Sequence, residues 1–283
     1  MRPISLCLLP ALLLGACSAG PTQPEGDADT GAQPSDTDTE EVSLDVDFVM
    51  DHVELLASGE GFDLTGDGAP DNALATIFEH PMIGDALGGD PDDYIARSVQ
   101  RGELLVLLDF DRLGDLQDDD SAGIDMLLGA SAGGGELFDG SGQFAVRCGS
   151  LDESGAAASV FEEVSLSGGA LSGAPGEFLF LMPFALDTVV VLREARIEAE
   201  MSADGLRMTG GTLGGSVTME DLEEVVENDP EIGPQFASIM LAILNAQLDV
   251  DQDGDGEPDA LSASFGFTAV RGAIDREGSC IDE

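Results

Sequence analysis

Two short stretches far apart in the chain share one pattern of oxygen-bearing side chains. They are FDLTGDGAPDNAL at residues 62–74 and VDQDGDGEPDAL at residues 250–261. Such side chains at the first, third, fifth and ninth positions, with glycine at the sixth and a backbone carbonyl at the seventh, wrap a chain around a hard cation such as Ca²⁺. The predicted ligands are Asp63, Thr65, Asp67, the Ala69 carbonyl and Asp71 in the first loop, and Asp251, Asp253, Asp255, the Glu257 carbonyl and Asp259 in the second.

The ligand chemistry favours calcium over other metals. Magnesium requires stricter octahedral geometry and fewer protein ligands, and zinc prefers histidine or thiolate ligands that both loops lack. The first loop has Thr65 where the second has Asp253, so we expect weaker binding in the first loop. Extracellular modules of this kind bind calcium at about 10⁻⁴ to 10⁻³ M. Clusters of Asp and Gly also form ordinary surface turns, and that alternative stays open.

Both loops differ from an EF-hand loop. Proline stands at the eighth position, and the twelfth is Leu74 or Ser262 in place of the bidentate glutamate. The loops are similar to the nine-residue calcium loops of integrin-type β-propeller blades and of thrombospondin type 3 repeats, which lie between or beside strands. With two copies only, the resemblance covers the loops and implies neither a propeller nor a repeat array.

The N-terminus has the layout of an export signal. Arg2 precedes an apolar run from Ile4 to Leu14, which is too short to span a bilayer. The sequence Leu14-Gly15-Ala16-Cys17 resembles the lipobox of bacterial lipoproteins, and this implies that residues 1–16 are removed and that Cys17 carries the lipids. Cleavage as an ordinary secreted protein is the alternative. Because Ser18, and not the Asp of the inner-membrane retention signal, follows the cysteine, the resemblance implies a bacterial outer-membrane location, facing the periplasm or the cell surface.

The segment after the lipidation site is predicted to be a tether. Residues 17–41 contain no aromatic or large aliphatic side chain and are rich in Asp, Glu, Thr, Ser, Gly and Pro. Such a segment cannot bury enough apolar surface to offset its ordering entropy. Residues 42–283 show no second linker of this kind, so we expect a single domain there.

The charge of the chain excludes one class of partner. It has 57 acidic and 10 basic residues, every basic residue is arginine, and the net charge is −47. A body so negative repels nucleic acid, since that binding rests on phosphate neutralisation. The absence of lysine removes P-loop and Schiff-base chemistry. With no Trp and one Tyr, Tyr94, a stacking platform for carbohydrate is disfavoured.

The cysteines predict one disulfide bond. Cys7 lies in the predicted signal and Cys17 at the lipidation site, which leaves Cys148 and Cys280. Two thiols in an exported protein most simply pair. A metal or catalytic thiol is the alternative, but neither cysteine has a nearby His or CxxC partner.

The body of the chain reads mainly as strands. Short apolar runs bounded by Gly and Asp occur at 103–110, 124–131, 143–151, 177–184 and 261–274, and residues 42–50 alternate between apolar and polar. Residues 189–208 predict a hairpin that turns at Asp204-Gly205. Helices are predicted at 72–78 and 92–101, after Thr218, and from Pro234. The expected fold is mainly β, with α+β possible: an antiparallel sandwich or curled sheet with helical insertions.

The sequence offers no convincing catalytic constellation, so we expect a protein without enzymatic activity. Residues 129–133, GASAG, match a nucleophile elbow around Ser131. Glycine is so abundant that a chance match is expected, and His52 and His80 both precede the serine, against the hydrolase order. A surface hydrolase with structural calcium loops remains the alternative.

Taken together, the signal, the tether, the two loops and the segment GGTLGGSV resemble a large set of uncharacterised lipoproteins from myxobacteria and their relatives. That resemblance carries no assigned activity. It implies a calcium-stabilised outer-membrane lipoprotein, held to the membrane by its lipids. We expect a structural, adhesive or protein-binding role, with an envelope or extracellular protein as partner.

Overall fold

A computed structural model describes residues 43–80, 90–133, 135–181, 189–228, 233–276 and 278–282. The predicted signal, Cys17 and the tether lie outside these residues. Nine strands dominate: β1 (Asp47–Leu55), β2 (Val106–Asp111), β3 (Asp118–Gly133), β4 (Gln143–Val146), β5 (Ser159–Ser167), β6 (Ala170–Leu181), β7 (Val189–Met201), β8 (Arg207–Thr218) and β9 (Ala260–Asp275).

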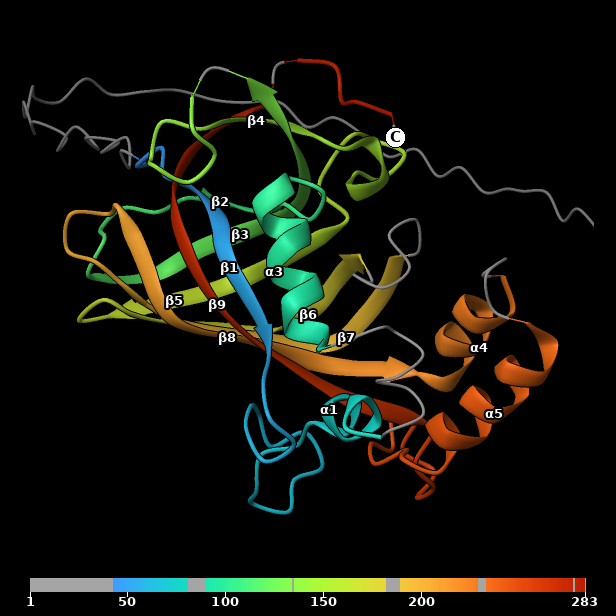
Figure 1. The fold of residues 1–283 in the computed structure, drawn as a ribbon. Helices are drawn as coiled ribbons and strands as arrows, with labels where there is room; N and C mark the ends of the chain where they lie inside the picture. Colours follow the sequence, from blue (N-terminus) through green and yellow to red (C-terminus); the bar gives the residue numbers. More distant parts are fainter. Residues whose placement is uncertain are drawn as a thin grey trace, which may run out of the picture. The chain divides into compact units, whose positions relative to one another are not determined.

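Eight of these strands close into a barrel-like sheet (Figure 1). Going around the ring, the order is β1, β2, β3, β5, β6, β7, β8 and β9, and β9 pairs with β1 to complete it. Every pairing in the ring is antiparallel. The mainly β prediction is therefore confirmed, and the sheet curls until it closes.

The ninth strand, β4, lies outside the ring. It pairs antiparallel with β3 and parallel with the end of β9. Beneath it lies a small apolar cluster, separate from the main core and built from the outward side chains of the neighbouring strands. Its buried members are Val49, Leu105, Leu107, Leu127, Phe144, Val146 and Val270.

The main core takes the alternate side chains of the same strands. On β2, for example, Val106, Leu108 and Phe110 belong to the main core and Leu107 to the outer cluster, as the period of two requires. On β7 the side chains of Ala195, Ile197, Ala199 and Met201 are buried together in the main core, as the alternation in the sequence predicts.

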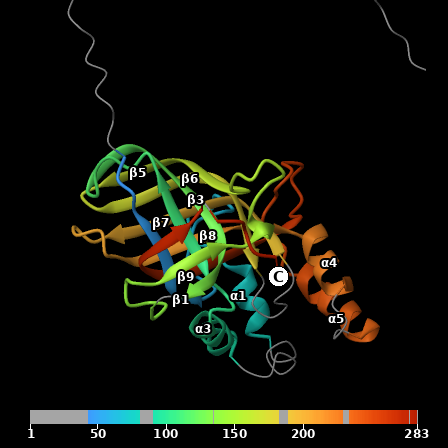
Figure 2. The same ribbon diagram turned by 90° about the horizontal axis from the view of Figure 1, so that it is seen from above.

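In the described residues, four α-helices flank the sheet: α1 (Ala73–Phe78), α3 (Pro91–Arg101), α4 (Met219–Asn228) and α5 (Pro234–Asn245). The predicted helices are confirmed, together with the Thr218 cap, whose hydroxyl accepts the Asp221 N–H at 3.3 Å. Seen from above, α4 and α5 lie side by side at one side of the sheet (Figure 2). Within the described part of the chain, no helix is long and apolar enough to cross a membrane.

Two strands differ from the sequence prediction because their register is irregular. β5 was not predicted, and β3 begins at Asp118, before the apolar run that marks it. The β3–β5 ladder shifts register between Asp119 and Ala122 and again between Ala122 and Ile124. These shifts break the alternation by which a half-buried strand is recognised.

Candidate metal centre

Both predicted loops lie at the same end of the sheet, where β1 ends and β9 begins (Figure 1). A backbone hydrogen bond between equivalent positions closes each loop. The Asp71 N–H donates to the Phe62 carbonyl at 2.8 Å, and the Asp259 N–H donates to the Val250 carbonyl at 2.9 Å. The similarity in sequence is therefore also a similarity in backbone structure.

The second loop is organised by its own carboxylates. One oxygen of Asp251 accepts the Gly254 N–H at 2.9 Å, and the other accepts the Gly256 N–H at 2.8 Å. Asp255 accepts the Glu257 N–H at 2.9 Å. The side chains at the first and fifth positions thus fold the backbone around themselves.

The first loop repeats these hydrogen bonds position by position. Asp63 accepts the Gly66 N–H at 2.7 Å and the Gly68 N–H at 3.0 Å, and Asp67 accepts the Ala69 N–H at 2.9 Å. Two loops with different residues at the second, third and seventh positions therefore adopt one geometry, and the shared residues are the ones that set it.

The glycines at the fourth and sixth positions explain why the sequence permits this turn. Their φ angles are +77° at Gly66 and +90° at Gly68, against +77° at Gly254 and +95° at Gly256. Backbone in this region is strained for any residue with a Cβ atom.

The ninth-position carboxylates fasten the loops. Asp259 accepts the Gln252 N–H at 2.7 Å, and Asp71 accepts the N–H groups of Leu64 and Thr65 at 2.8 and 2.9 Å. Ligation of a metal by these two side chains, and by the carbonyls of Ala69 and Glu257, stays a prediction. The hydrogen bonds show that the ninth position also has a structural task.

The aspartates at the first, third and fifth positions of the second loop form the candidate metal centre. One oxygen from each of Asp251, Asp253 and Asp255 can be chosen so that all three lie within 4.8 Å of one another. All three residues are exposed, so a cation can reach them from solvent. An all-carboxylate set suits a hard cation such as Ca²⁺. The first loop offers two carboxylates and the Thr65 hydroxyl at the equivalent positions.

The start of β9 joins the two loops through buried polar groups. Asn72, which follows the first loop, donates from its side chain to the Ser264 carbonyl at 2.9 Å. The Ser262 hydroxyl accepts the Ala73 N–H at 2.7 Å and donates to the Asp249 carboxylate, which precedes the second loop, at 2.5 Å. Asn72, Ser262 and Ser264 are at most 2% exposed, so the loops share one rigid support.

The side chain of Asp249 is partly buried, which is unusual for a carboxylate. Burial raises the pKa of its carboxyl above the ordinary value, hydrogen bonds from Ser262 oppose that rise, and the negative charge of Asp71 adds to it. A negative charge in the first loop therefore raises the pKa of a residue that precedes the second loop.

The predicted disulfide is confirmed. Cys148, just after β4, is bonded to Cys280 near the C-terminus. Backbone hydrogen bonds flank the bond, since Ile281 receives the Cys148 N–H at 3.1 Å and donates its own N–H to the Val146 carbonyl at 3.0 Å.

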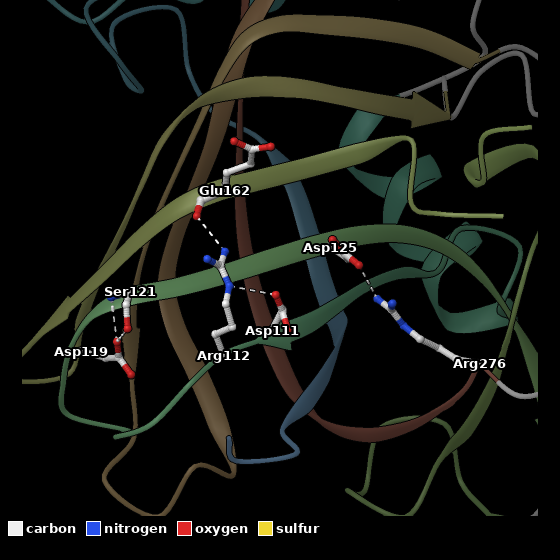
Figure 3. Close-up of polar contacts among 7 residues, drawn as sticks. All are labelled: Asp111, Arg112, Asp119, Ser121, Asp125, Glu162 and Arg276. Carbon is white, nitrogen blue, oxygen red and sulfur yellow. Dashed lines mark hydrogen bonds and ion pairs between the residues drawn. The ribbon is translucent and has the colours of Figure 1, made fainter. Parts of the chain in front are cut away.

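A second cluster of charge was not predicted from the sequence. Asp47, Asp109 and Asp125 lie on β1, β2 and β3 and are direct cross-strand partners. Arg276 contacts Asp109. It also reaches Asp125 at 2.8 Å, the contact drawn in Figure 3. These groups lie in a cavity of about 470 Å³ lined by Asp45, Asp47, Asp109, Phe110, Asp111, Asp125, Ile274, Asp275 and Arg276.

Burial raises the pKa of two aspartates in this second cluster. Burial raises the pKa of Asp109 to about 7, the Arg276 guanidinium opposes the rise, and the carboxylates of Asp47 and Asp125 add to it. Burial also raises the pKa of Asp47. A carboxylic acid inside an apolar strand, as in LLVLLDF, is the signal in the sequence that could have identified the cluster.

The nucleophile-elbow motif does not have the geometry of an elbow. Ser131 lies within β3, opposite Phe144 of β4, and not on a strand-to-helix turn. His52 lies on β1 with its Nε2 atom 3.6 Å from a Glu54 oxygen, on the surface. Comparison of the chain with protein-family models, with curated proteins and with solved structures gives no match.

Proposed function

We propose that this chain is a calcium-stabilised lipoprotein of the bacterial outer membrane with a structural, adhesive or protein-binding role. The observation that carries the proposal is the pair of loops with one hydrogen-bonding pattern, one of which places Asp251, Asp253 and Asp255 together.

The choice of calcium follows from the donor set. The second loop offers carboxylate oxygens and the backbone carbonyl of Glu257, the kinds of ligand that Ca²⁺ prefers. A cation between three exposed carboxylates also removes their mutual repulsion, which is unfavourable in a chain of this net charge. Calcium therefore stabilises the folded form, because the unfolded chain does not hold the three side chains together.

The proposed role follows from where the loops lie. Both are surface segments fixed to one end of a closed sheet by the buried groups around Ser262 and Ser264. Binding residues are often carried on loops that a rigid scaffold positions. A metal that stiffens both loops would present one ordered surface to a protein partner in the envelope or outside the cell.

Calorimetric titration with calcium tests the metal proposal. The chain is expected to bind calcium at about 10⁻⁴ to 10⁻³ M, more weakly in the first loop than in the second. Asp253→Asn removes the heat of the tighter site, while Asp120→Asn, an exposed carboxylate of β3, leaves it unchanged. Equal heats with magnesium, or heats that survive Asp253→Asn, would contradict a calcium site in the second loop.

Membrane partition tests the proposed anchor separately. The chain expressed in a bacterium with the lipoprotein pathway is expected in the membrane fraction, and Cys17→Ala moves it to the soluble fraction. Membrane association that persists in Cys17→Ala would contradict anchoring through lipids on that residue.

A further inference from the structure

The C-terminal strap, defined here as Arg276 with residues 278–282, is held against the sheet at several points. Just before it, the end of β9 pairs with β4 through residues 273–275. Further along, Cys280 is bonded to Cys148 and Ile281 pairs with Arg147. Arg276 lies between these attachment points, and its side chain makes ionic contacts with the sheet.

Those contacts are with a row of aspartates that should repel one another. Asp47 pairs with Asp109, and Asp109 pairs with Asp125, in the registers of β1–β2 and β2–β3. Directly opposite residues in an antiparallel sheet have Cβ atoms about 4.5 to 5.5 Å apart, and like charges there are destabilising. One guanidinium faces three carboxylates in this row.

Among the residues that the structure describes, no second cation is paired with the row. Asp45 precedes β1, Asp111 ends β2 and Asp275 ends β9, and all three line the same cavity. Arg112 is engaged with the Asp111 carboxylate and the Glu162 carbonyl (Figure 3). Arg271 donates to the Asp45 carbonyl.

The row can relieve its repulsion by holding a proton. Asp47 and Asp109 are directly opposite in the register of β1 and β2, and a proton on one of two neighbouring carboxylates removes their mutual repulsion. When Asp109 carries the proton, Arg276 keeps one charge-assisted contact, to Asp125. When Asp109 is ionised, Arg276 has two, and each such contact is stronger than a neutral hydrogen bond.

We propose that Arg276 and the row of Asp47, Asp109 and Asp125 form a pH-dependent ionic latch, which holds the C-terminal strap to the sheet in parallel with the Cys148–Cys280 disulfide. The latch is tight when Asp109 is ionised and weak when it is protonated. Release of the strap would leave the carboxylates of Asp47, Asp109 and Asp125 without the counter-ion that Arg276 supplies. The raised pKa of Asp109, about 7, places the change near neutral pH.

Hydrogen exchange at Ile281 tests the latch once the disulfide is removed. Its N–H donates to the Val146 carbonyl, so its protection reports whether the strap is docked. In the full chain with Cys148→Ser and Cys280→Ser, protection corrected for intrinsic exchange is expected to be roughly tenfold higher at about pH 8.5 than at about pH 5.5. Adding Arg276→Gln or Asp109→Asn lowers protection at the higher pH to that at the lower pH. Adding Arg101→Gln, a surface arginine of α3, does not.

Two results would overturn the proposal. One is equal protection of Ile281 at both pH values, whether high or absent, while the buried Leu107 amide of β2 stays protected. The other is full protection in the Arg276→Gln variant. If the disulfide-free protein does not fold, NMR titration of the Asp109 carboxyl in the disulfide-bonded chain decides. Arg276→Gln must then move its midpoint to higher pH, and an unchanged midpoint refutes the latch.

Discussion

Asp63 and Asp251 hold the same two backbone N–H groups in their respective loops, those of the fourth and sixth positions. The two residues lie at opposite ends of the folded chain and are brought to the same end of the sheet by the pairing of β1 with β9. The repeated sequence is therefore a repeated local structure, and its properties can be tested in either copy.

Replacing a glycine of the second loop is expected to destabilise the protein because of the backbone conformation at that position. Gly256→Ala places a Cβ atom at a φ of +95° although nothing lies within 4 Å of it. The cost should be about 1 to 2 kcal/mol, measured by urea unfolding. Gly59→Ala is the matched control, since that glycine has open space and its φ lies outside the left-handed region. Equal stability of the two variants would show that the loop is free to change conformation.

The weaker first loop should be improved by one carboxylate. Thr65→Asp gives the first loop the third carboxylate that Asp253 gives the second, so calcium affinity there should rise roughly tenfold, within the range over which ligand charge tunes such loops. Thr65→Asn is the control, because it has the same shape without the charge. Calorimetry measures both variants, and an affinity gain shared by the asparagine variant would argue against charge as the cause.

The shared support of the loops should be sensitive to Ser262. Its hydroxyl is fully buried, and Ser262→Ala leaves the Ala73 N–H without its acceptor and removes the hydroxyl that donates to Asp249, which keeps only the Ser262 backbone N–H. A cost of about 1 to 3 kcal/mol is expected. In a protein of this size each kcal/mol lowers the melting temperature by about 2 to 4 °C. Ser165→Ala, on the exposed face of β5, should change it little, and a similar loss in both variants would contradict a special role for Ser262.

Asp109 should make stability depend on pH. Its pKa is raised from 3.8 to about 7 on folding, chiefly by burial, so the folded chain binds this proton more tightly than the unfolded chain. As pH rises from about 4 to about 7, the contribution of Asp109 to the free energy of unfolding therefore decreases. Above about pH 7 that contribution no longer changes with pH. Asp109→Asn removes this loss, so the variant should gain stability relative to the parent chain as pH rises. Denaturant unfolding across this range checks it, and parallel pH profiles would contradict it.

Much of the fold and part of the site could be predicted from the sequence because the signals are local. The hairpin of β7 and β8 follows from the alternation ending at Asp204-Gly205, α4 from its Thr218 cap, and the calcium-type loops from spacing alone. The disulfide followed from counting cysteines in an exported chain.

The features that were missed depend on partners distant in sequence. The registers of β1, β2 and β3 bring Asp47, Asp109 and Asp125 into one row. The register between two strands cannot be predicted from the sequence of either strand alone. Closure of the sheet likewise depends on pairing between β3 and β5, whose ladder is irregular. That Ser262 joins the two loops could not be predicted without knowing that the start of β9 lies between them.

Thermal unfolding of the full chain with and without calcium tests the central claim most directly. At about 10 mM calcium and a dissociation constant near 10⁻⁴ to 10⁻³ M, each site adds about 1.4 to 2.7 kcal/mol, which should raise the melting temperature by several degrees. A chelator should reverse the rise, and Asp255→Asn should remove most of it while Asp120→Asn does not. If calcium leaves the melting temperature unchanged, the two loops are surface turns and the proposed calcium clamps do not exist.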